Sequence, residues 1–259
     1  MNEKAFTADL HLDHYNIVLH TSRMPWICPN PNYDLDKPRH FKYNNPWAVD
    51  IKAHDQDIIA NINNLYSKKD TLYILGDFAY KDHARYINMI KPKLVLIKGN
   101  HDKASQNVYK LFSEVHEMGC RKIFNDNGKK IDVTLCHYGM KTWASSCHGS
   151  MCLFGHSHGR LPEFDNMFSF DVGVDVWGYA PVPWDAIVEK MKRIQDKIDA
   201  AGGRFVDGEF KASGLYDKDP NQRMLDTRAK NKEIMQYLGY DIDERMWPTE
   251  LISEEREDV

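Results

Sequence analysis

The sequence contains no apolar run that approaches the ~20 residues of a membrane-spanning helix, and its first residues lack the apolar centre of a signal peptide. We therefore expect no association with a membrane. The sequence also lacks an excess of basic residues. It has 34 basic and 38 acidic residues, and its formal net charge is −4. The net charge thus gives no support to non-specific nucleic-acid binding. The chain has neither internal repeats nor low-complexity tracts.

The sequence has only five cysteines, an odd number, and their spacing is not typical of disulfides. This usage predicts a reducing compartment, and we expect a cytoplasmic protein. One alternative is a zinc knuckle, which would need thiolate and imidazole ligands close together. The residues that could form it are Cys147, His148, Cys152 and His156. Cys152 lies in an apolar run, however, which favours a small buried hydrophobic residue.

The sequence does contain short apolar stretches that each end in polar side chains. Leu94–Ile97 predicts a buried strand, because it is rich in β-branched residues and flanked by lysines, and Gly99 ends it. A loop set on a strand end is where α/β proteins usually carry their chemistry. The side chains that leave this strand end are Asn100, His101 and Asp102.

Four more stretches repeat this pattern. They are residues 4–8, Thr71–Leu75, Ile131–Cys136 and Ser150–Phe154. The polar side chains that follow them are Asp9 and His11, Asp77, His137, and His156 and His158. The paired residues in the first and last groups are two apart, a spacing that points both side chains to the same side of an extended chain. One such group alone is more often a polar loop, but five together predict a metal site.

Helical patterns alternate with these strands. Asp50–Tyr66 has apolar residues at helical spacing, with its first residue as a candidate N-cap, and a shorter helical pattern covers Tyr86–Ile90. Residues 103–130 are less regular, and Phe168–Val176 alternates like a closing strand. Strand–helix–strand alternation predicts an α/β fold with parallel strands.

The C-terminal part predicts helices without recognisable chemistry. An amphipathic helix starts near Pro183 or Trp184 and is ended by Gly202–Gly203. A second helix is expected near Gln222–Tyr237, and Ser253–Val259 has the composition of a frayed end. We expect one domain over residues 1–200 and an extension over 201–259 that packs on it or forms an oligomer contact.

Residues 21–47 differ from their surroundings. Five prolines exclude a long helix or a central strand here, and the aromatic residues between them are not typical of a solvated linker. Two interpretations stay open. The segment is an ordered insertion that covers one side of the site and shapes the substrate pocket, or it is a loop packed on its own aromatic residues.

The ordered set Asp-x-His, Gly-Asp, Gly-Asn-His-Asp, His and Gly-His-x-His over residues 9–158 resembles the calcineurin-like metallophosphoesterases. Asp171–Asp175 is also similar to the closing strand of compact bacterial and phage-encoded members. One departure is Cys136, since many members have glycine before the histidine of the fourth motif. Residues 21–47 and those after about residue 200 lie outside the resemblance.

This resemblance implies a four-layer α/β/β/α sandwich of two mixed sheets flanked by helices, with two divalent metal ions. Mn²⁺ is the expected metal, with Fe, Zn²⁺ and Ni²⁺ as alternatives, because oxygen and imidazole ligands suit all four. The implied ligands of one ion are Asp9, His11, Asp77 and His158. The implied ligands of the other are Asp77, Asn100, His137 and His156, so that Asp77 bridges the ions.

The same resemblance implies that His101 lies near the substrate and protonates the leaving group, with Asp102 orienting it. His14 and Asn16 are candidates for substrate contact, and His14 is equally well a hydrogen-bonding neighbour of a ligand. The remaining histidines receive no role and are expected mostly at the surface or in loops. These are His20, His40, His54, His83, His116 and His148.

The expected function is therefore hydrolysis of a phosphodiester or phosphomonoester by attack of a metal-bridging hydroxide. A net positive centre would attract an anionic phosphate, and nucleotides or cyclic nucleotides fit such a site. A nuclease differs from this expectation in its substrate alone. An alternative of another class is a non-catalytic scaffold that kept the fold for protein interaction, although such relatives typically lose ligands that are present here.

Overall fold

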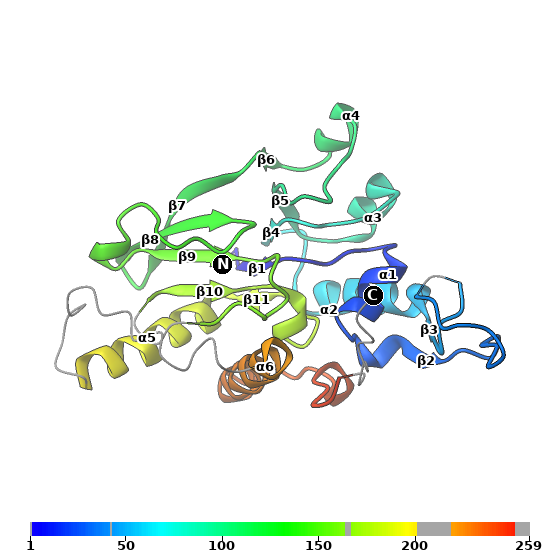
Figure 1. Ribbon diagram of the computed structural model, residues 1–259. Coiled ribbons are helices and arrows are strands. Elements are labelled where there is room, and N and C mark those ends of the chain that lie inside the picture. The colour runs from blue at the N-terminus through cyan, green and yellow to red at the C-terminus, as the bar shows by residue number, and fades with distance from the viewer. Residues whose placement is uncertain (1, 42, 164–166, 201–218, 252–259) are drawn as a thin grey trace.

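The protein has a mixed α/β fold in a computed structural model that describes residues 2–41, 43–163, 167–200 and 219–251. Two larger sheets lie side by side in Figure 1. The five-stranded sheet has the order β11-β1-β4-β5-β6, in which only β11 is antiparallel to its neighbour. Its strands are β1 (Lys4–Thr7), β4 (Thr71–Leu75), β5 (Lys93–Ile97), β6 (Glu114–His116) and β11 (Val182–Pro183).

The four-stranded sheet has the order β10-β9-β8-β7 and contains one antiparallel pair, the hairpin of β7 and β8. Its strands are β7 (Gly119–Asp126), β8 (Lys129–Cys136), β9 (Met151–Phe154) and β10 (Ser169–Asp171). The described helices are α1 (Tyr15–His20), α2 (Ile51–Leu65), α3 (His83–Met89), α4 (Gln106–Tyr109), α5 (Trp184–Ala200) and α6 (Pro220–Tyr237). The short 3₁₀ turns are η1 (Met24–Trp26), η2 (Ser146–His148), η3 (Val174–Val176) and η4 (Glu244–Met246). The α/β class and the parallel strands of the first sheet are as predicted.

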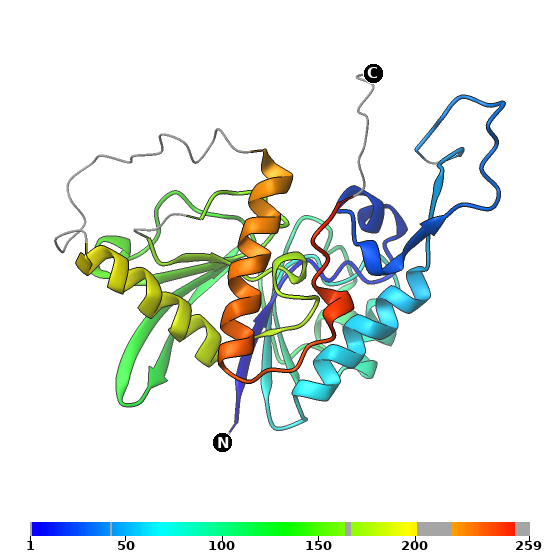
Figure 2. The same ribbon diagram turned by 90° about the horizontal axis from the view of Figure 1, so that it is seen from below.

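The inner faces of the two sheets share one apolar core. The five-stranded sheet contributes Phe6 and Val95, and the four-stranded sheet contributes Leu135 and Leu153. Helices α5 and α6 pack on the same core, and Figure 2 shows them in front of the strands. Their residues in this core are Ala186, Ile187, Ile194, Met224, Ile234 and Met235. Part of the C-terminal extension therefore belongs to the main core of the protein.

The outer face of the five-stranded sheet is covered by α2 and α3. Ile58 and Ile62 of α2 are fully buried in a second core, together with Leu72 and Leu96 of the sheet. Each isoleucine buried in this way contributes ~1.5–3 kcal/mol. The N-cap predicted for α2 is present, because the Asp50 carboxylate accepts the Ala53 N–H at 2.9 Å.

Two predicted elements differ from the structure. The closing strand expected over Phe168–Val176 ends at Asp171, because the Asp171 carboxylate accepts the Gly173 N–H at 2.7 Å and turns the chain into η3. Residues 103–130 contain α4, β6 and the eight-residue strand β7, where we expected little regular structure. The overlooked signal is Asn127-Gly128, whose φ values of 48° and 87° fit a two-residue hairpin turn.

The proline-rich segment forms a two-stranded ribbon of β2 (Ile27–Pro29) and β3 (Trp47–Val49) that extends away from the larger sheets in Figure 1. Among its described residues there is no long helix or central strand, as predicted. Its loop is closed by the Asn44 side chain, which donates to the carbonyls of Asp34, Lys37 and Pro38 at 2.9–3.1 Å. The helix stop predicted at Gly202–Gly203 and the frayed end at 253–259 lie outside the described residues. No helix in the described part of the chain is long and apolar enough to cross a membrane.

Candidate metal centre

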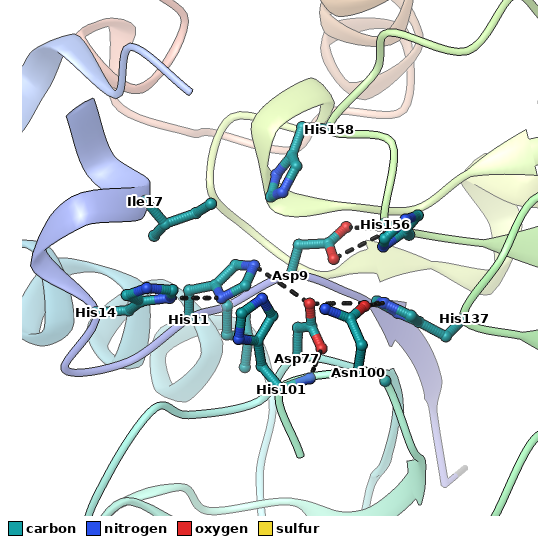
Figure 3. Close-up of polar contacts among 12 residues, drawn as sticks. Asp9, His11, His14, Ile17, Asp77, Asn100, His101, His137, His156 and His158 are labelled. Carbon is teal, nitrogen blue, oxygen red and sulfur yellow. Dashed lines mark hydrogen bonds and ion pairs between the residues drawn. The ribbon is translucent and has the colours of Figure 1, made fainter. Parts of the chain in front are cut away.

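Polar side chains from the ends of β1, β4, β5, β8 and β9 converge on one place, as Figure 3 shows. The structure forms two groups of three possible ligands, and the ligand atoms of each group lie within 4.8 Å of one another. One group is Asp9, His11 and His158, and the other is Asp77, His137 and His156. Asn100 joins the second group, because its Oδ1 lies 3.1 Å from His137 Nε2. The structure thus brings together all seven ligands expected from the sequence.

Asp77 lies between the two groups. Its Oδ2 atom is 3.5 Å from His11 Nε2 and also 3.5 Å from His137 Nε2. Two ligand atoms bound to one ion at bond lengths near 2.1 Å and a tetrahedral angle are separated by about 3.4 Å. One carboxylate oxygen therefore has ligand-like spacing to both groups. Asp9, His11 and His158 are called the buried half below, and Asn100, His137 and His156 the open half.

The side chains reach the centre through a left-handed backbone, not through an extended one. The φ values are 58° at Asp9, 50° at His11, 56° at Asp77, 68° at His156 and 48° at His158. The expectation that paired residues two apart share one side of a strand was wrong for this reason. Such conformations cost roughly 1–3 kcal/mol per residue and persist only where the surroundings enforce them, which occurs mainly at functional sites.

Main-chain hydrogen bonds enforce these conformations. The pairing of β1 with β4 continues beyond both strands, since the Asp9 N–H donates to the Gly76 carbonyl at 3.0 Å and the His11 N–H donates to the Asp77 carbonyl at 2.9 Å. The Asp9 carboxylate also accepts the His156 N–H, at 2.8 and 3.0 Å to its two oxygens. The loops after β1, β4 and β9 are therefore joined to one another.

Two glycines allow these loops to approach so closely. A Cβ atom at Gly76 would lie 2.2 Å from His137 Nδ1, and φ at this glycine is +87°. A Cβ atom at Gly99 would lie 2.3 Å from Asp77 Oδ1. Any side chain at either position would displace a candidate ligand, which explains why glycine precedes Asp77 and Asn100.

Hydrogen bonds fix the ring nitrogens that face the centre. His137 Nδ1 lies 2.8 Å from the Leu75 carbonyl, and His158 Nδ1 lies 2.7 Å from Asp175 Oδ2. Both partners only accept, so each Nδ1 donates, and in the neutral ring each Nε2 has the lone pair that a ligand needs. His11 Nε2 is buried and lacks a hydrogen-bond partner within the described residues, although it points at Asp77. A buried nitrogen of this kind fits a metal ligand.

The electrostatics of the centre also favour a cation. Burial, and then the nearby carboxylates of Asp171 and Asp77, raise the pKa of Asp9 well above its usual range. Burial, followed by the neighbouring His158, lowers the pKa of His11 well below its usual range. Burial likewise lowers the pKa of His156. Carboxylates that repel one another beside neutral imidazoles form a donor set that divalent ions would stabilise. The residues present therefore fit two divalent metal ions.

Asp102 joins two loops of the centre. Its carboxylate accepts the backbone N–H groups of Asp77, Gly99 and Phe78, at 2.7, 2.8 and 2.9 Å. These bonds tie the loop after β4 to the loop after β5. No hydrogen bond within the described residues joins the Asp102 carboxylate to the His101 ring, so the structure gives Asp102 a role in holding the loops, and its orienting role stays a prediction.

His101 and His14 flank the buried half. The centre of the His101 ring lies 5.3 Å from those of His11 and His14, and its backbone N–H donates to Asp77 Oδ1 at 2.9 Å. His14 Nδ1 is 3.1 Å from His11 Nδ1, the position of a hydrogen-bonding neighbour of a ligand. Burial, then His101, lowers the pKa of His14 to about 4. Asn16 is exposed on α1, and no hydrogen bond of the described residues joins it to the centre.

Arg23 and His54 form a buried pair near the centre that was not expected from the sequence. Arg23 is fully buried and binds Asp175 through two hydrogen bonds of 2.9 Å. His54, one of the histidines that received no role from the sequence, is also fully buried and lies 2.8 Å from the Arg23 guanidinium. His83 is buried as well. No motif marked Arg23, because it lies in the proline-rich segment, whereas apolar neighbours at helical spacing could have placed His54 on the inner face of α2.

The zinc knuckle is not formed. Cys152 is fully buried within β9, whereas Cys147 is exposed in η2. Neither group of possible metal ligands in the described residues contains a cysteine. The expectation that Cys152 is a small buried residue is confirmed.

No family model matches this chain. It is similar to an uncharacterized protein of Methanocaldococcus jannaschii, MJ1445, with 26% identity over 162 residues that cover 59% of this chain and 83% of that protein. It is also similar to the Gene 66 protein of Mycobacterium phage L5, with 26% identity over 180 residues, 58% of this chain and 86% of that protein. A crystal structure of AQ665 from Aquifex aeolicus, a protein of unknown function, aligns with a TM-score of 0.47 and 19% identity over 73% of this chain and 99% of that one. The names of these proteins state no activity, so a functional assignment depends on the residues of the centre.

Proposed function

We propose that the protein is a metal-dependent phosphoesterase with a dinuclear centre, built on the four-layer sandwich of the calcineurin-like metallophosphoesterases. The observation that carries this proposal is the position of Asp77 Oδ2, which lies 3.5 Å from one imidazole nitrogen of each ligand group. A shared carboxylate oxygen is the arrangement that holds two ions close enough to act on one phosphoryl group. The cytoplasmic location inferred from the unpaired cysteines is part of the same proposal.

The donor set defines the metals that the centre would hold. It offers carboxylate, amide and imidazole groups without thiolate, which suits Mn²⁺, Fe, Zn²⁺ or Ni²⁺, and we propose Mn²⁺. When bound, two such ions would supply Lewis-acid stabilisation of a phosphoryl group and an activated water. The protein itself contributes fixed ligand orientations, through the Nδ1–H groups of His137 and His158 and through the strained loops.

His101 is the residue proposed to act on the leaving group. Its backbone N–H donates to Asp77, and its partly exposed ring lies beside His11 and His14. From there a protonated imidazole can donate to the leaving oxygen of a phosphodiester, which contributes ~10²–10⁴-fold to the rate. Phosphomonoesters, nucleotides and cyclic nucleotides are the substrates to compare.

The test is hydrolysis of bis-p-nitrophenyl phosphate and p-nitrophenyl phosphate by metal-depleted protein reloaded separately with Mn²⁺, Fe²⁺, Zn²⁺ or Ni²⁺. We expect metal-dependent turnover, and a fall of ~10²–10⁴-fold for the diester in His101→Gln with an unchanged metal content. The matched control is His148→Gln, which changes an exposed histidine of η2 and should leave the rate unaltered. A panel of cyclic nucleotides and oligonucleotides then separates the phosphodiesterase from the nuclease. Protein that binds two ions yet hydrolyses none of these esters would favour the scaffold.

A further inference from the structure

Arg23 lies at the centre of a buried network that connects to each member of the buried half. We propose that Arg23 is the positioning residue that assembles this half, and that the open half is assembled without it. The inference rests on the proposed function, because it assigns Arg23 to one of the two ion sites of the same centre. It concerns how the ligands are held and not the chemistry of the reaction.

All five N–H groups of the Arg23 guanidinium have acceptors. Nε donates to Asp175 Oδ1 at 2.9 Å, and Nη2 donates to Asp175 Oδ2 at 2.9 Å and to the Asp9 carbonyl at 2.7 Å. Nη1 donates to the Leu10 carbonyl at 3.1 Å and to His54 Nε2 at 2.8 Å. A planar fork with every donor satisfied has one orientation, so Arg23 is a rigid part of the centre.

Arg23 holds the backbone that carries two of the ligands. The carbonyls of Asp9 and Leu10 belong to the left-handed stretch in which Asp9 and His11 both have positive φ. Two charged hydrogen bonds to consecutive carbonyls fix the orientation of these peptide groups. The side chains of Asp9 and His11 then project to the same place, as Figure 3 shows.

Arg23 reaches the third ligand through Asp175. Asp175 Oδ2 accepts from Arg23 and also accepts from His158 Nδ1 at 2.7 Å. The carboxylate, itself fixed by a bidentate pair, therefore sets both the tautomer and the direction of the His158 ring. Arg23 thus acts on Asp9 and His11 through the main chain and on His158 through Asp175.

The open half is held in another way. His137 is oriented by the Leu75 carbonyl, and the loops that carry Asp77 and Asn100 are joined by Asp102. The backbone N–H of His156 donates to the Asp9 carboxylate, which is the link between this half and the buried half. Within the described residues, the hydrogen bonds of the Arg23 side chain go to Asp175, Leu10, His54 and Asp9, and none of them reaches these residues of the open half. Loss of the Arg23 fork should therefore weaken the ion site of the buried half much more than that of the open half.

The test measures Mn²⁺ binding to Arg23→Lys and Asp175→Asn. Lysine keeps the charge but cannot form the fork, and an amide at position 175 sets an N–H donor against one guanidinium N–H in either orientation. We expect wild-type protein to bind two ions and to show the electron paramagnetic resonance signal of a coupled Mn²⁺ pair. In each variant one site should weaken ~10–100-fold and the coupled signal should give way to that of single Mn²⁺ ions.

The matched control is Arg121→Lys, which changes a bidentate Arg–Asp pair at the surface and should retain both ions. Adding His137→Ala to Arg23→Lys should remove the remaining ion. Circular dichroism verifies that each variant is folded, and Asp175→Asn carries the comparison if Arg23→Lys does not fold. Folded variants that keep both ions at wild-type affinity, or that lose both equally, would overturn the assignment of Arg23.

A second measurement does not require metal or a variant. Nitrogen-15 NMR of the histidine rings in metal-free wild-type protein reports which nitrogen of His158 carries the proton. We expect the Nδ1–H tautomer, because Asp175 accepts from Nδ1. An Nε2–H tautomer would overturn the link from Arg23 to His158. Wild-type protein that binds no ions but shows the Nδ1–H tautomer would refute the phosphoesterase and leave the positioning network intact.

Discussion

The two halves of the candidate centre are built from similar ligands but are supported differently. In the buried half, no ligand residue is more than 9% exposed, and the support is a buried guanidinium with its carboxylate. In the open half, Asn100 and His156 are exposed, and the support comes from a main-chain carbonyl and from Asp102. Ligands that face solvent can receive a substrate, whereas ligands fixed below the surface provide a rigid base. We therefore expect a phosphoester to approach over the open half.

Asp77→Asn should have the largest effect, because Asp77 is the residue that both halves share, so the change should affect both ion sites. The amide is isosteric but neutral, and Asp77 Oδ2 is the atom spaced equally from both groups. Replacing a direct ligand should exceed the 10–100-fold loss typical of a residue that only supports a ligand, so both ions should be lost together. Elemental analysis after dialysis measures the metal content. Asp132→Asn at the surface is the control, and a full complement of two ions in Asp77→Asn would refute the shared oxygen.

Asp102→Asn should have the next largest effect and should act on the open half. The amide keeps one accepting oxygen and sets an N–H₂ group against backbone donors that the carboxylate now satisfies. The free energy of unfolding should fall by about 3 kcal/mol, measured by urea denaturation without metal. The ion of the open half should also bind more weakly than that of the buried half. A variant as stable as wild type that loses only the function of His101 would support the orienting role expected for Asp102.

The sequence was sufficient to predict the elements that place the ligands. Short apolar stretches followed by glycine, carboxylate or histidine residues identified β1, β4, β5, β8 and β9, and the chain does bring their ends together. The local rule used to orient the side chains was nevertheless wrong. Asp9, His11, His156 and His158 have positive φ, a conformation that depends on hydrogen bonds from distant loops. A spacing of two residues cannot reveal it.

The support for the ligands was the part that could not be predicted. Arg23 and Asp175 are separated by 152 residues, and neither belongs to a periodic pattern that demands its partner. His54 received no role from the sequence, although it lies on the buried face of α2. Burying a charge is favourable only when its partners are already in place, so it follows from the complete fold and not from local sequence.

His54→Gln should have the smallest effect. It tests whether the network that supports the buried half makes the stability of the protein depend on pH. Burial lowers the pKa of His54 to about 4, partly opposed by its hydrogen bond to Asp55. Neutral His54 accepts from Arg23 through Nε2, and a protonated ring would set a donor against the guanidinium. The unfolded chain, with a histidine pKa near 6.5, binds the proton more readily than the folded protein. Stability should therefore be lost as the pH falls from about 6.5 to about 4, by about 2 kcal/mol between pH 7 and pH 5.

Glutamine at position 54 keeps an acceptor for Arg23 but does not titrate. The variant should be about 1 kcal/mol less stable at pH 7, because the bond to Asp55 is lost, and its stability should change less between pH 7 and pH 5 than that of wild type. Urea denaturation at both pH values measures the difference, and His148→Gln at the surface is the control. If His54→Gln loses as much stability as wild type, the titrating group lies elsewhere, and His14, whose pKa is also about 4, becomes the group to replace. In that case the pH dependence would belong to His14, which lies 3.1 Å from His11, and not to the buried network of Arg23.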